Sequence, residues 1–98
     1  RRHAVPVGTF GHAGDGNLHP TFLFPRDVDD AERRLAAAQA ELYEAALALG
    51  GTVTGEHGIG AARRSWLVRQ RGEAAVAVMR SIKHALDPQG LLNPGKVL

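Results

Sequence analysis

Residues 11–19 read Gly-His-Ala-Gly-Asp-Gly-Asn-Leu-His and place two histidines, His12 and His19, on either side of a glycine-rich turn. Glycine supplies the backbone freedom that a tight reversal needs. The flanking stretches Ala4–Phe10 and Leu18–Phe24 carry apolar and aromatic residues typical of strands. We therefore predict a β-hairpin with the two histidines flanking its turn, and with their Cβ atoms about 5 Å apart if they are directly opposed.

The second predicted strand divides its side chains between two faces. Alternation puts His19 on one face and both Phe22 and Phe24 on the other, so the phenylalanines are expected to face the core. Asp15 and Asn17 lie in the turn, and turn formation alone can explain both. Asp15 can instead orient a histidine from outside a metal site, and Asn17 can donate a hydrogen bond to a bound molecule.

The middle of the chain has the pattern of one long helix. Asp29 followed by Glu32 is typical of a helix N-terminus, and apolar residues then recur at intervals of three and four. We predict a helix over residues 30–49 that ends at Gly50-Gly51. Thr52–Thr54 is short and β-branched, which predicts a third strand.

Two further helices are predicted after Gly60. The first carries Trp66 and stops before Gly72, and the second runs from about Glu73 to Leu86, where Asp87-Pro88 ends it. The second helix has one apolar stripe, made of Ala75, Met79, Ile82 and Leu86. The order strand, strand, helix, strand, helix predicts an α+β fold with helices on one face of an antiparallel sheet.

Composition limits the classes of function. A chain of 98 residues is expected to form one small domain. Its net charge of +2 comes from basic residues scattered among acidic ones, which argues against nucleic-acid binding. It has no cysteine, so any metal must be held by nitrogen and oxygen ligands. No apolar run is long enough to span a bilayer, and we expect a cytoplasmic protein that reaches a membrane only through partners.

A second histidine motif lies further along, where Glu56 and His57 sit in Gly55-Glu-His-Gly-Ile-Gly60. Imidazole and carboxylate are ligands that zinc and similar divalent ions accept, and three protein ligands leave one position open for substrate. Adjacent residues of an extended segment point to opposite sides. Both side chains can therefore serve one site only if the flanking glycines bend the loop.

Three motifs carry a family resemblance: residues 11–19, residues 55–60 and residues 82–96, which read Ile-Lys-His-Ala-Leu-Asp-Pro-Gln-Gly-Leu-Leu-Asn-Pro-Gly-Lys. Together they resemble the C-terminal segment of FAD-linked oxidoreductases of the vanillyl-alcohol-oxidase type. The most similar branch contains D-lactate dehydrogenase, D-2-hydroxyglutarate dehydrogenase and the flavin subunit of glycolate oxidase. The resemblance spans nearly the whole chain, whereas the family's N-terminal FAD-binding domain and the first half of its substrate domain have no counterpart here.

The resemblance implies a function and a set of site residues. The chain would be part of a flavin-dependent enzyme that oxidises a small D-2-hydroxy acid to the 2-oxo acid. His12, His19 and Glu56 would hold a divalent metal, most simply zinc, and His57 would be the catalytic base. Asn17 would contact substrate or flavin.

The resemblance also implies an arrangement of the chain, as half of a ferredoxin-like substrate domain. Residues 1–86 would belong to that domain, and residues 87–98 would form a tail that returns to the flavin domain. Asn93, within Leu92–Lys96, would then contact the FAD that the missing domain mainly holds. A simple proline-glycine turn explains Asn93 equally well.

A second class of function stays open, since the same residues could form a non-catalytic metal-binding or oligomerising domain left after truncation. On either interpretation, the chain by itself should expose apolar surface that a missing half would cover. We expect a homo-oligomer, most simply a symmetric dimer formed through an unpaired sheet edge or the helix face. The isolated chain should retain no flavin and be inactive.

Overall fold

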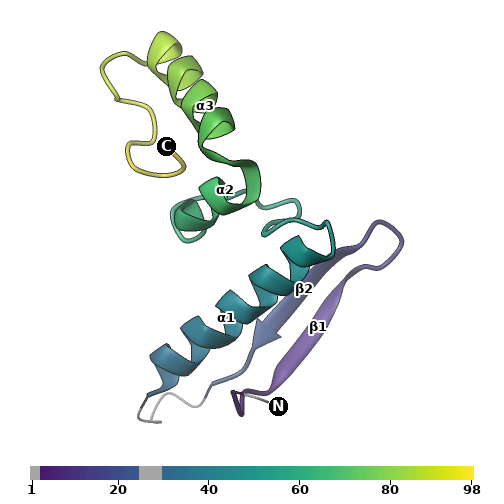
Figure 1. The fold of residues 1–98 in the computed structure, drawn as a ribbon. Helices are drawn as coiled ribbons and strands as arrows, with labels where there is room; N and C mark the ends of the chain where they lie inside the picture. Colours follow the sequence, from purple (N-terminus) through teal and green to yellow (C-terminus); the bar gives the residue numbers. More distant parts are fainter. Residues whose placement is uncertain (1–2, 25–29) are drawn as a thin grey trace. The chain divides into compact units, whose positions relative to one another are not determined.

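The computed structural model describes residues 3–24 and 30–98 (Figure 1). It contains a two-stranded antiparallel sheet and three helices, which confirms the α+β class. The chain divides into two compact units, Arg1–Glu56 and His57–Leu98. The elements in chain order are β1 (Val7–His12), β2 (Asn17–Phe22), α1 (Ala31–Ala48), α2 (Arg64–Arg71) and α3 (Glu73–Leu86). No helix in the described ranges is both long and apolar enough to cross a membrane.

The first unit opens with the predicted hairpin. Its strands lie closer to the turn than expected, because pairing continues to His12 and Asn17 and leaves only four residues in the turn. Gly11 makes this possible, with a φ of 146°. A Cβ atom at Gly11 would lie 2.2 Å from the backbone oxygen of Asn17, so any other residue would push the strands apart.

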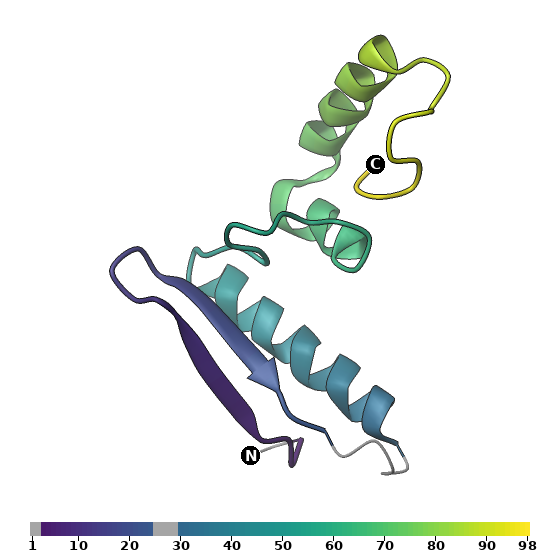
Figure 2. The same cartoon turned by 180° about the vertical axis from the view of Figure 1, so that it is seen from behind.

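Helix α1 lies along the hairpin in both views (Figures 1 and 2). Val7, Pro20 and Phe22 of the hairpin line a cavity of about 440 Å³ together with Ala38 and Leu42 of the helix. Phe22 is half-buried and lies on the same face of β2 as Pro20, so the prediction that it faces the core is confirmed. His19 lies on the opposite face.

The bounds of α1 confirm the predicted helix, but its N-terminus differs. Asp29 lies outside the described residues, and the cap position is Asp30, whose side chain makes no capping hydrogen bond. The Asp30 carboxylate is instead paired with Arg33. At the other end the predicted Gly50-Gly51 stop is confirmed, since the Gly51 N–H donates to the Ala46 oxygen at 2.8 Å.

The predicted third strand at Thr52–Thr54 is wrong. Only β1 and β2 form a sheet among the described residues. The Thr52 hydroxyl donates to the Thr54 carbonyl, which folds the segment onto itself, and Val53 is buried with 4% of its surface exposed. β-branched residues favour strands only where a neighbouring strand offers pairing. This segment is therefore an irregular link that anchors itself through Val53 and leads to Glu56.

The second unit contains α2 and α3, whose bounds confirm both predicted helices. Its buried apolar residues are Leu67 and Val76. The C-terminal end of the predicted apolar stripe is exposed, since Ile82 and Leu86 are 56% and 79% exposed. Amphipathic spacing identifies a helix face that can be buried. Within the second unit only the N-terminal half of this face, with Ala75 and Met79, is partly buried.

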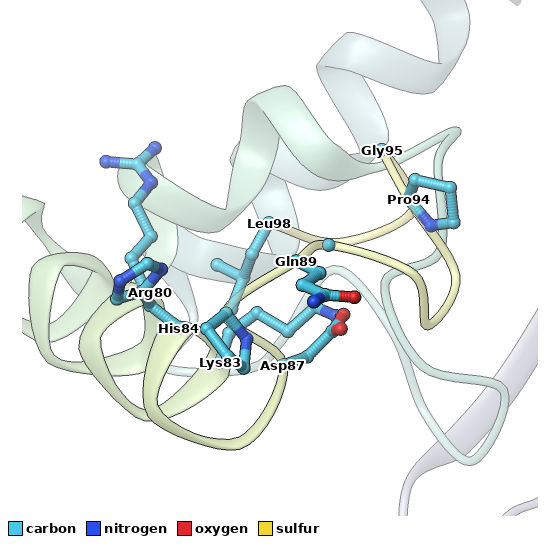
Figure 3. Close-up of a pocket in the computed structure, with 10 residues that line it drawn as sticks. Arg80, Lys83, His84, Asp87, Gln89, Pro94, Gly95 and Leu98 are labelled. Carbon is cyan, nitrogen blue, oxygen red and sulfur yellow. The ribbon is translucent and has the colours of Figure 1, made fainter.

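The tail after α3 is held by Asp87, which is buried. Its carboxylate accepts hydrogen bonds from the Lys83 ammonium and from the backbone N–H groups of Leu91 and Leu92. These contacts fold the tail back beside α3 around a cavity of about 370 Å³, lined by Arg80, Lys83, His84 and Pro94 among others (Figure 3). The Lys83 hydrogen bond, followed by that from Leu92, lowers the pKa of Asp87 to about 2.

Candidate metal centre

The turn end of the hairpin brings His12 and His19 onto one face of the sheet. They are not directly opposed, because His12 pairs with Asn17 and His19 pairs with Phe10. The two histidines are therefore diagonal neighbours, for which Cβ atoms lie about 7 Å apart rather than 5 Å. A group that contacts both imidazoles must therefore lie between them, above the diagonal that joins positions 12 and 19.

Glu56 occupies that position. Its Oε1 lies 3.4 Å from Nε2 of His19, and its Oε2 lies 3.9 Å from Nε2 of His12. The His19 side chain is 23% exposed, whereas those of Glu56 and His12 are 52% and 66% exposed. The link after α1 thus brings one carboxylate against both hairpin histidines, and the group remains open to solvent on the side of His12.

Asn17 fixes the orientation of this carboxylate. Its Nδ2 donates to Glu56 Oε2 at 3.0 Å, while its backbone N–H donates to Asp15 Oδ1 at 3.0 Å. Asp15 therefore serves the turn, and Asn17 serves both the turn and the carboxylate. The sequence alone did not predict that the side-chain amide of Asn17 donates a hydrogen bond to Glu56.

Gly55 is a functional position that sequence reasoning missed. A Cβ atom there would lie 2.0 Å from Oδ1 and 2.8 Å from Cγ of Asn17. The absence of a side chain is what lets the Asn17 amide reach Glu56. A glycine immediately before a candidate ligand was the available signal, because such glycines often mark a close approach.

Phe10 is a second residue that sequence reasoning missed. Its ring stacks on the imidazole of His19, with centroids 5.3 Å apart and an interplanar angle of 23°. The directly opposed register of these two residues produces this stack. The stack restricts the orientation of the His19 ring, so that its Nε2 is held toward Glu56.

The donor groups of His12, His19 and Glu56 are of the types that bind divalent metal ions. Ligands at about 2.0–2.1 Å from a tetrahedral zinc lie roughly 3.3 Å from each other. The distance of 3.4 Å from His19 Nε2 to Glu56 Oε1 is close to this value, and the distance of 3.9 Å from His12 Nε2 to Glu56 Oε2 is longer. The two contacts use different oxygens of the carboxylate, Oε1 toward His19 and Oε2 toward His12. Imidazole nitrogen and carboxylate oxygen are ligand types that zinc accepts, and Asn17 supplies the outer hydrogen bond that such ligands usually have.

His57 and Asn93 belong to the second unit. The backbone bends at residues 55–57, which is the condition under which Glu56 and His57 could serve one site. The side chain of His57 is exposed. Asn93 has a φ of 47°, and its carbonyl accepts from the Lys96 N–H at 3.3 Å. Asn93 therefore lies in a turn, as the simpler interpretation predicted. A contact between Asn93 and the flavin stays a prediction.

Comparison with known proteins identifies similar sequences. The family model for FAD linked oxidases, C-terminal domain, matches residues 1–97. Glycolate oxidase subunit GlcD of Bacillus subtilis (strain 168) is 43% identical over 96 residues, covering 98% of this chain and 20% of that protein. The probable mitochondrial D-lactate dehydrogenase of Danio rerio is 46% identical over 89 residues, covering 90% and 18%. A D-2-hydroxyglutarate dehydrogenase of Xanthomonas citri pv. viticola is 44% identical over 90 residues, covering 90% and 19%. The chain spans about a fifth of the length of these relatives.

Proposed function

The chain belongs to the family of FAD linked oxidase C-terminal domains, and on this premise we propose that it is part of a flavin-dependent oxidoreductase. The proposed reaction oxidises a small D-2-hydroxy acid to the 2-oxo acid. Relatives whose names specify glycolate, D-lactate and D-2-hydroxyglutarate support this class, since all three compounds carry a hydroxyl group next to a carboxylate.

The observation that carries the proposal is the Glu56 carboxylate held between two imidazoles. His19 is oriented by Phe10, and Glu56 is oriented by Asn17. Groups held in this way need little reorganisation to act together on one ligand. His12, His19 and Glu56 are the residues that would hold a divalent metal ion, most simply zinc, and the open side of the site leaves room for a substrate.

The metal ion, when bound, would act as a Lewis acid toward the substrate carboxylate and hydroxyl, and FAD, held mainly by the rest of the enzyme, would accept the hydride from the α-carbon. His57 takes the hydroxyl proton as the general base. Asn17 acts through Glu56, as a positioning residue, because its amide already donates to that carboxylate. Asn93 is the residue of the tail that would contact the flavin.

The metal assignment can be tested on the 98-residue chain itself. We expect one zinc ion per chain after loading and mild dialysis, and its loss in the double variant His12→Ala/His19→Ala. The matched control is His84→Ala, which removes an exposed histidine of α3 and should leave metal content unchanged. Equal zinc in the wild type and the double variant would refute the assignment.

Variants of the complete flavoenzyme distinguish the proposed role of Glu56 as a metal ligand from that of His57 as the general base. Glu56→Ala should lose metal and activity together. His57→Ala should keep its metal and lower turnover by about 10²- to 10⁴-fold, which is the usual contribution of a general base. If both variants lose metal equally, His57 is a ligand and the proposed base is wrong. If metal binds but no hydroxy acid is oxidised, the non-catalytic alternative stands instead.

A further inference from the structure

Polar contacts hold the start of the tail in the second unit. Leu91 and Leu92 are 71% and 63% exposed, so burial of their side chains does not fix the chain after α3. Both backbone groups of Leu92 are nevertheless paired, since its N–H donates to Asp87 Oδ2 at 2.9 Å and its carbonyl accepts from Lys83 Nζ at 2.7 Å. The Leu91 N–H donates to Asp87 Oδ1 at 2.9 Å. We call this set of one carboxylate, one ammonium and the two leucine backbones the tail clasp.

The clasp uses a buried carboxylate where apolar packing could hold the tail at lower cost. Asp87 is 8% exposed and is the one charged residue that is buried within residues 3–24 and 30–98. Its partner Lys83 lies beside it (Figure 3). Taking a carboxylate out of water is unfavourable, and ion pairing and hydrogen bonds only offset that cost. Compared with apolar packing, such a pair adds little net stability, but it fixes one arrangement of the groups it joins.

Asn93 is the residue that directly follows the clasp. Its φ of 47° lies in the left-handed region, which asparagine adopts more readily than most residues. The Asn93 carbonyl accepts from the Lys96 N–H at 3.3 Å, which closes a turn on the far side of Asn93. The backbone of Asn93 is therefore held from both sides, by the paired Leu92 and by this turn, while Asn93 itself is exposed.

We propose that Asp87 and Lys83 are positioning residues, which hold Asn93 in place for the flavin. This role rests on the proposed function, in which Asn93 contacts FAD. A hydrogen bond to a ligand forms only when its donor and acceptor meet within a narrow range of distance and angle. Because the clasp orders the backbone before FAD arrives, binding does not have to restrict the tail, and the affinity for FAD is higher.

Amide exchange on the 98-residue chain tests the clasp itself. Asp87→Asn keeps the shape of the side chain but has only one acceptor oxygen, so exchange at Leu91 or Leu92 should become about ten-fold faster. The Gly90 N–H donates to the Asp87 backbone carbonyl at 3.0 Å and should keep its rate, which makes it the internal control. Unchanged exchange at both leucines would overturn the proposal, since the carboxylate would then not hold the tail.

The affinity of the complete flavoenzyme for FAD tests the link to Asn93. Asn93→Gly removes the amide and still allows the left-handed backbone. It should raise the dissociation constant of FAD by about 3- to 10-fold, the usual effect of one hydrogen bond. Asp87→Asn should raise the constant by a similar factor. The double variant should match Asn93→Gly alone, because Asp87 then has no amide left to position.

Val76→Ala is the matched control, since it weakens α3 through a buried apolar contact and leaves the clasp in place. Its FAD dissociation constant should equal that of the wild type, and circular dichroism verifies that all variants fold. An equal effect of Val76→Ala and Asp87→Asn would mean that the clasp serves stability alone.

Two other results would overturn the positioning role and leave the contact of Asn93 with flavin intact. The first is an unchanged FAD affinity in Asp87→Asn. The second is an equal effect of Asp87→Asn with and without Asn93→Gly, because the two residues would then act independently. An unchanged affinity in Asn93→Gly would instead refute the proposed contact with flavin, and the positioning role with it.

Discussion

Replacing Gly55 by alanine is the sharpest test of the carboxylate's position. The added Cβ would lie 2.0 Å from Asn17 Oδ1, and an ordinary contact needs at least about 3.4 Å. The Asn17 amide must therefore move by roughly 1.4 Å. Its hydrogen bond to Glu56 Oε2, now 3.0 Å, cannot survive such a shift. The backbone at Gly55 is not in the left-handed region, so alanine should otherwise be accepted.

The expected cost falls on metal affinity rather than on folding. Losing a hydrogen bond that orients a ligand typically weakens metal binding by about 10- to 100-fold, or about 1.4 to 2.7 kcal/mol. Since the clash involves the end of a side chain, Asn17 can swing aside and the hairpin should stay folded. Asn17→Ala removes the same hydrogen bond without a clash and should produce a similar loss.

Titration calorimetry with zinc on the 98-residue chain measures the effect. Gly14→Ala is the matched control, because a Cβ there meets no atom within 4 Å. Its affinity should stay within about two-fold of the wild type. If Gly55→Ala binds zinc as tightly as Gly14→Ala while Asn17→Ala does not, the steric argument is refuted. If neither Gly55→Ala nor Asn17→Ala weakens binding, Asn17 does not support the ligand.

Three further predictions concern folding. Gly11→Ala places a Cβ 2.2 Å from backbone and should strongly lower the melting temperature, whereas Gly8→Ala, which meets no atom within 4 Å, should lower it little; equal effects would contradict the close approach. Asp87 has a lowered pKa of about 2, so its stabilising contribution is complete above about pH 4 and should disappear as the pH falls to 2; denaturant unfolding of Asp87→Asn should lack this pH dependence. Val76→Ala should destabilise the chain by about 2 kcal/mol, since Val76 is 1% exposed, and an unchanged midpoint in urea would show that α3 is not anchored there.

The helices could be predicted closely because their signals are local. Periodicity and the stops at Gly50, Gly72 and Asp87 depend on neighbouring residues only, and the three helices end where these residues predict. The third strand failed for the opposite reason. Thr52–Thr54 has the intrinsic preference for a strand, but pairing depends on a distant partner that local sequence does not reveal.

The candidate site was predicted in its residue types but not in its geometry. The sequence indicated His12, His19 and Glu56, and the structure brings these three together. The diagonal placement of the histidines depends on where pairing ends at the turn, and spacing alone does not determine this register. The contact of Asn17 with Glu56 joins residues 39 positions apart, and so lies beyond any local pattern.

The stack of Phe10 on His19 leaves the side chain of His19 with less conformational entropy than that of His12. A ring held against another ring in the folded chain has already lost much of its rotational freedom, so fixing it further costs little. His12 is 66% exposed and keeps more of its rotamers until a ligand restricts them. The entropic cost of closing the site therefore falls mainly on His12, and the flexibility of one exposed side chain governs how readily the site closes.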